Sequence, residues 1–100
     1  MIQNVYAVFD HAAKAFLPPF LMRTDSQAQR AFAEVANSRG HAINEHPGDY
    51  NLFKIGTYDD SLGTVQNLEP APFNLGSALL HLKPAAATAA NQPTVPEDVQ

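Results

Sequence analysis

The sequence predicts an α+β domain in which a small antiparallel sheet carries one main helix packed on one face. Residues 25–39 repeat apolar side chains every three or four positions, as an amphipathic helix does. The flanking segments, residues 4–20 and 50–68, are rich in β-branched and aromatic residues and each contains a turn signal. The order is therefore hairpin, helix, hairpin. Its simplest packing lays the helix across one face of the sheet.

The first hairpin is expected near the N-terminus. Residues 4–9 (Asn-Val-Tyr-Ala-Val-Phe) favour a strand, residues 10–14 a turn, and residues 15–20 a returning segment. Pro18 and Pro19 have no amide hydrogen to donate, so this returning segment must be an edge strand or a covered extended arm.

The helix has a start signal and a stop signal. Thr24 is a favourable N-cap, and Gln27 three residues later completes a capping box. Gly40 suits the left-handed position that follows a helix, which predicts a helix from Asp25 to Arg39. The apolar stripe consists of Ala28, Ala31, Phe32, Val35 and Ala36.

The second hairpin is expected from a strand over residues 50–58, a turn over 59–63 and a partner strand over 64–68. Gly56 inside the first of these strands suggests a bulge or the close approach of a neighbouring backbone. Residues 74–82 are expected to form a short helical turn or a docked arm.

Composition changes after Lys83, which divides the chain into a single domain at residues 1–83 and a tail at residues 84–100. The tail has three prolines, many alanines and no aromatic residue, and Glu97 and Asp98 make it acidic. Such a segment buries too little apolar surface to offset the entropy of ordering, so we expect it to be disordered. The remaining domain is small enough for its core to be marginal, and homodimerisation is expected to bury more apolar surface.

Charge and composition exclude several classes of protein. The chain has six Lys and Arg and ten Asp and Glu, which gives a formal charge of -4. This charge argues against a strongly basic protein that neutralises many phosphates of a nucleic acid at once. The absence of cysteine excludes a disulfide framework and cysteine-ligated zinc. No apolar run is long enough to span a bilayer and no export signal is visible, so a cytoplasmic protein is expected.

Catalytic and metal motifs are weak. His41, Glu45, His46 and Asp49 lie close together, but their spacing matches no common zinc pattern. The chain has no Gly-x-Ser-x-Gly motif and no phosphate-binding glycine loop. We therefore expect no enzyme activity, no metal and no cofactor. The enzyme alternative would require the histidine group to be buried and convergent.

Aromatic and basic residues suggest a contact surface. If Phe9, Phe53 and Ile55 point towards the helix, alternation along the strands turns tyrosines outwards. Exposed tyrosines beside basic side chains could stack on bases and contact phosphates, although an aromatic sheet face serves equally well as a dimer interface. The candidate residues are Lys14, Arg23, Arg30 and Lys54 for phosphates, and Tyr6, Tyr50 and Tyr58 for stacking.

A set of short motifs resembles one known family over about residues 3–82. The motifs are Phe9-Asp10, Lys14-Ala-Phe-Leu-Pro-Pro-Phe20, Arg30-Ala-Phe-Ala33, His46-Pro-Gly-Asp-Tyr50, Leu52-Phe-Lys-Ile-Gly56 with Tyr58-Asp59, and Leu75-Gly76. In this order they resemble the small non-structural protein of gokushoviruses, single-stranded DNA bacteriophages of the Microviridae.

This resemblance implies a protein of the host bacterial cytoplasm that acts in viral DNA replication, in particular in producing single strands, and that binds DNA. It carries over no catalytic motif. We thus expect a non-catalytic protein that binds single-stranded DNA, or a viral or host replication protein, through its sheet face. The alternative is a dimeric adaptor that binds a viral or host protein and never contacts nucleic acid.

Overall fold

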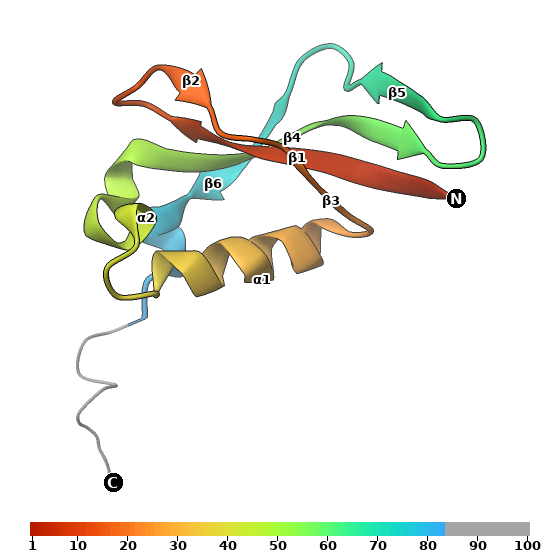
Figure 1. Cartoon of the computed structure of the whole chain (residues 1–100). Coiled ribbons are helices and arrows are strands. Elements are labelled where there is room, and N and C mark those ends of the chain that lie inside the picture. The colour runs from red at the N-terminus through yellow and green to blue at the C-terminus, as the bar shows by residue number, and fades with distance from the viewer. Residues whose placement is uncertain (84–100) are drawn as a thin grey trace, which may run out of the picture.

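A six-stranded antiparallel sheet forms one layer of the molecule, and the helix α1 lies beneath it as the second layer (Figure 1). The computed structural model describes residues 1–83, so the expected tail at residues 84–100 lies outside the described residues. The α+β class with one main helix is confirmed. The elements are β1 Ile2–Asp10, β2 Ala15–Phe16, β3 Phe20–Met22, α1 Asp25–Ala36, α2 Ala42–Glu45, the 3-10 turn η1 Pro47–Asp49, β4 Tyr50–Asp59, β5 Thr64–Asn67, β6 Phe73–Ser77 and the 3-10 turn η2 Ala78–His81.

The two long strands β1 and β4 pair along their whole length at the centre of the sheet, from Ile2 opposite Asp59 to Asp10 opposite Tyr50. The register shifts once, between Val5 and Tyr6. Gly56 lies next to this shift, where a Cβ atom would overlap the carbonyl oxygen of Gln66 in β5. The predicted close backbone approach is therefore confirmed.

Each long strand has two short strands on its outer side. β2 and β3 pair with β1, and residues 17–19 between them leave the ladder at Pro18 and Pro19, as the missing amide hydrogens require. β5 and β6 pair with β4. The strand β6 was not predicted, whereas the helical turn within residues 74–82 is present as η2.

The start of α1 matches the prediction. Thr24 Oγ1 accepts a hydrogen bond from the Gln27 amide at 3.1 Å, and the Arg23 amide donates to Gln27 Oε1 at 3.1 Å. The first bond satisfies one of the amides that the first turn of a helix leaves free, and the second ties the residue before the N-cap to the helix.

The end of α1 differs from the prediction. The helix ends at Ala36 and not at Arg39, because Asn37 caps it. Asn37 Nδ2 donates to the carbonyl oxygens of Ala33 and His81, both at 2.8 Å, and Asn37 Oδ1 accepts from the Lys83 amide at 2.9 Å. The chain then turns through Gly40, whose φ is +86°, four residues after the helix has ended.

The core lies between the sheet and α1, and its composition corrects the predicted orientation of the strands. Phe9, Phe53 and Ile55 lie outside the buried core cluster. The side chains that point towards α1 are their strand neighbours, so the prediction was reversed. The core cluster consists of Tyr6, Val8, Ala28, Phe32, Ala36, Ile43, Tyr50, Leu52 and Ala78.

No helix among residues 1–83 is long and apolar enough to cross a membrane.

Candidate nucleic-acid interface

Three phenylalanines form a cluster on the face of the sheet opposite to α1. The ring centroids of Phe9 and Phe16 are 4.8 Å apart, those of Phe16 and Phe53 5.6 Å, and those of Phe9 and Phe53 6.4 Å. All three pairs meet edge to face, a favourable arrangement for aromatic rings. Phe16 remains 47% exposed. We call this cluster the aromatic face.

Strand register brings the three rings together. Phe9 in β1 lies directly opposite Phe16 in β2. Phe53 in β4 lies opposite Ala7 of β1, and the small side chain of Ala7 leaves room for the larger rings on either side. Because side chains alternate between the two faces of a strand, burial of the neighbouring residues against α1 turns these rings to the other side.

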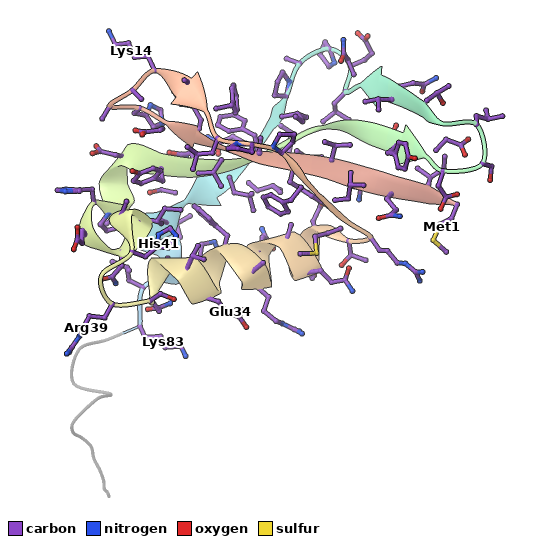
Figure 2. All side chains as sticks on the ribbon, viewed as in Figure 1. Met1, Lys14, Glu34, Arg39, His41 and Lys83 are labelled. Atoms are coloured by element: carbon purple, nitrogen blue, oxygen red, sulfur yellow. The ribbon has the colours of Figure 1, made fainter. Side chains whose placement is uncertain are left out.

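Two polar side chains border the aromatic face. The His11 ring meets Phe9 edge to face at 4.8 Å, and its Nε2 lies 3.1 Å from Asn51 Oδ1. Lys14 lies in the turn between β1 and β2 with a φ of +56°. Its side chain is exposed and extends from the end of this hairpin, on the side of the sheet away from α1 (Figure 2).

A groove of about 500 Å³ continues from Phe16 along the same face. The loop between β5 and β6 rises on this side of the sheet (Figure 1) and supplies one wall of the groove, and the arm between β2 and β3 supplies the other. Most of its lining is apolar, and Glu69 is its one carboxylate. The lining residues are Ala7, Phe16, Leu17, Pro19, Ile55, Asn67, Leu68, Glu69, Pro70, Ala71 and Pro72.

The four predicted phosphate contacts do not form one surface. Lys14 borders the aromatic face, but Arg23 precedes α1 and Arg30 is exposed on α1 itself. Lys54 points to the helix side, where its Nζ lies 3.7 Å from Asp25 Oδ1. Only Lys14 therefore belongs to the hairpin that carries Phe9 and Phe16, whereas Lys54 lies opposite the exposed Phe73 on the helix side of the sheet.

Two of the three predicted stacking residues are buried, so their assignment to a surface is wrong. The side chain of Tyr6, in the middle of β1, is fully buried, and Tyr50 is buried at the start of β4. Burial raises the pKa of Tyr6 to about 12, helped by its hydrogen bond to Asp25, and burial also raises the pKa of Tyr50. Tyr58 is half-buried and lies beside Val65 of β5.

The histidine group after α1 does not converge. His41, Glu45 and His46 are exposed, and His41 Nδ1 accepts a hydrogen bond from the Ile43 amide at 3.1 Å, which caps α2. Among residues 1–83, no three histidine or carboxylate side chains are grouped so as to hold a metal ion.

The sequence contains a signal for the exposed position of Phe16 that strand alternation alone does not reveal. Phe16 directly precedes the Leu17-Pro18-Pro19 arm, whose prolines confine this segment to an edge of the sheet, where a strand has a neighbour on one side only. Since Phe16 had to pair with the end of the first strand, Phe9 was its natural neighbour.

Comparison with known proteins identifies a family for this chain. No curated protein and no solved structure shows significant similarity to the chain. The family model described as Phage ORF5 protein matches residues 3–79, which include α1 and all of the sheet except Ile2. The chain is therefore a bacteriophage protein and belongs to the Phage ORF5 protein family.

Proposed function

We propose that this protein is a non-catalytic accessory factor in the production of a single-stranded DNA phage genome, and that it binds single-stranded DNA through the aromatic face. Family membership supports a phage protein. The motif resemblance to gokushoviruses supports the single-stranded genome, the Microviridae as the source and the cytoplasm of the bacterial host as the place of action.

The observation that carries this proposal is the accessible cluster of Phe9, Phe16 and Phe53, with the exposed Lys14 two residues before Phe16 in the turn between β1 and β2. Proteins that bind single strands without sequence preference stack bases on aromatic side chains and place cations along the backbone. Phe16, the most exposed of the three, would carry a base, and Lys14 would contact a neighbouring phosphate.

The net charge of the chain determines how strongly the affinity for DNA should depend on salt. The net charge is -4, and Lys14 is the only one of the four candidate cations beside the cluster. Each phosphate neutralised on a single strand contributes about -0.7 to the slope of log K against log salt. One or two such contacts give a slope of about -1, so stacking and not counterion release supplies most of the affinity.

The test is titration of a fluorescent oligothymidylate with the full chain at 50 and 200 mM salt. Phe16→Ala should weaken binding by about 5- to 150-fold, because base stacking contributes about 1–3 kcal/mol per base. Phe73→Ala is the matched control: Phe73 is 58% exposed but pairs with Lys54 on the other face of the sheet, so its loss should leave affinity unchanged. No binding at 50 mM salt, or equal loss in both variants, contradicts the proposal.

A second candidate function is a protein–protein adaptor, favoured by the apolar, proline-walled groove beside Phe16. A groove of this kind suits an extended peptide of a viral or host replication protein. Affinity capture from infected cells distinguishes the two functions. The wild-type chain is compared with Leu68→Glu, which places a charge in the lining of the groove. Recovery of one partner after nuclease treatment, lost in Leu68→Glu, supports the adaptor, whereas loss of all partners on nuclease treatment contradicts it.

A further inference from the structure

The outer edge of β5 is an open strand edge. β5 ends the strand order β2-β1-β4-β5, and all four of its residues are exposed. Val65 is 66% exposed and Leu62, in the turn before the strand, is 73% exposed.

The hydrogen bonds of the β4–β5 hairpin show which backbone groups face outwards. The Leu68 amide donates to the Ile55 carbonyl oxygen at 3.0 Å, and the Gly63 amide donates to the Asp59 carbonyl oxygen at 2.8 Å. Alternation along an antiparallel ladder then turns the amide and carbonyl of Thr64 and Gln66 towards β4. Those of Val65 and Asn67 point away from the sheet.

This edge lacks the features that protect edge strands from pairing. Proteins commonly use charged side chains, prolines or bulges for this purpose. Residues 61–68 contain no charged residue and no proline.

The other edges of the sheet are interrupted. On the β1 side, Pro18 and Pro19 break the edge between β2 and β3. On β6, the Gly76 amide donates to Asn74 Oδ1 at 2.9 Å and is thus already satisfied. β5 is therefore the strand edge best suited to accept another strand among residues 1–83.

We propose that a second copy of this chain pairs with β5 in antiparallel fashion and joins the two sheets into one. The register that sets Val65 against Asn67 of the second copy uses the outward amide and carbonyl groups of both residues on each strand. It places Gln66 opposite Gln66 of the second copy, on the two-fold axis. An uncharged strand fits its own copy without the like-charge repulsion that a charged edge would meet.

The two-fold axis of this pairing runs perpendicular to the sheet, so both copies of α1 lie on one side and both aromatic faces on the other. Tyr58, the cross-strand neighbour of Val65, would flank the junction in each copy. The dimer would thus present one continuous surface, whether that surface meets DNA or protein.

Sedimentation of the full chain over a range of concentrations tests the pairing. The wild-type chain should dimerise, and Val65→Pro should weaken the dimer about 30-fold, because it removes one outward amide hydrogen per copy while sparing the bonds to β4. Val65→Thr keeps the amide and should dimerise like wild type. A wild-type chain that stays monomeric at high micromolar concentration overturns the proposal.

A charge pair at the axis tests the register without altering the backbone. Gln66→Lys and Gln66→Glu should each weaken self-association by up to about fivefold, because like charges then face each other. An equimolar mixture of the two variants should restore dimerisation as a heterodimer. If each variant alone dimerises as tightly as wild type and mixing changes nothing, the dimer does not form through β5.

Discussion

The hydroxyl of Tyr6 donates a hydrogen bond of 2.6 Å to Asp25 Oδ1 and so links the middle of β1 to the first turn of α1. Asn4 Nδ2 donates to the same hydroxyl at 3.1 Å, and Lys54 Nζ lies 3.7 Å from the same carboxylate oxygen. A fully buried phenol thus has both a donor and an acceptor partner, as buried polar groups require. This link orients α1 on the sheet.

Removal of the Tyr6 hydroxyl should destabilise the fold. Tyr6→Phe leaves the ring in place but deletes a hydrogen bond to a charged group, so we expect a loss of about 1–2 kcal/mol in the free energy of unfolding. Urea denaturation followed by circular dichroism measures it. Tyr58→Phe, at a half-buried ring that makes no side-chain hydrogen bond among the described residues, is the control and should change stability little. Equal effects would contradict the role assigned to the Tyr6–Asp25 bond.

Alkaline pH should unfold the protein through its buried tyrosines. The pKa of Tyr6 is raised from 10.0 to about 12 in the folded state, so folding favours the neutral phenol. That contribution is fully present below pH 10 and is lost as pH rises from 10 through 12. The raised pKa of Tyr50 acts in the same direction.

The measurement is the urea midpoint between pH 8 and 11.5. We expect the midpoint to fall above pH 10, and to fall less steeply in Tyr6→Phe, which retains only the contribution of Tyr50. A midpoint that is independent of pH in the wild type would show that Tyr6 titrates normally.

Asn37 should stabilise the end of α1 and the segment that follows η2. Asn37→Ala removes three hydrogen bonds, to Ala33, His81 and Lys83. We expect the free energy of unfolding to fall by about 2 kcal/mol. Hydrogen exchange at the amides of residues 79–83 should accelerate. Ser38→Ala, which removes one exposed hydrogen bond to the Glu34 carbonyl oxygen, is the control. It should change neither the free energy of unfolding nor this hydrogen exchange. Unchanged exchange in Asn37→Ala would show that other contacts hold this segment.

A side chain at position 56 should disturb the sheet. Gly56→Ala places a Cβ atom against the Gln66 carbonyl oxygen, and backbone cannot move aside as a flexible side chain would, so we expect a loss of about 1–3 kcal/mol. Gly48→Ala is the control, because its Cβ would meet only Leu79 Cδ1 at an ordinary 3.6 Å. Thermal unfolding measures both variants. A melting temperature that falls more in Gly48→Ala than in Gly56→Ala would contradict the predicted clash at position 56.

Local signals predicted the elements well where one residue type has a specific backbone role. Thr24 and Gln27 marked the start of α1, and Gly63 marked the β4–β5 turn, where its φ is +66°. The end of α1 was placed too late because Gly40 was the recognisable stop signal. Asn37 caps the helix by reaching His81 and Lys83, residues distant in sequence, which no local pattern reveals.

Sequence alone determined the α+β class, the order of hairpin, helix and hairpin, and the alternation of faces along the two long strands, since these follow from local periodicity and turn chemistry. Only the tertiary structure decided which face meets α1. Both faces of β1 are apolar, with Tyr6 and Val8 on one side and Ala7 and Phe9 on the other, so alternation gave no polarity to distinguish them. The helix covers the Tyr6 side, where alanines around Phe32 leave room for the ring and Asp25 satisfies its hydroxyl. That choice leaves the phenylalanines on the accessible surface.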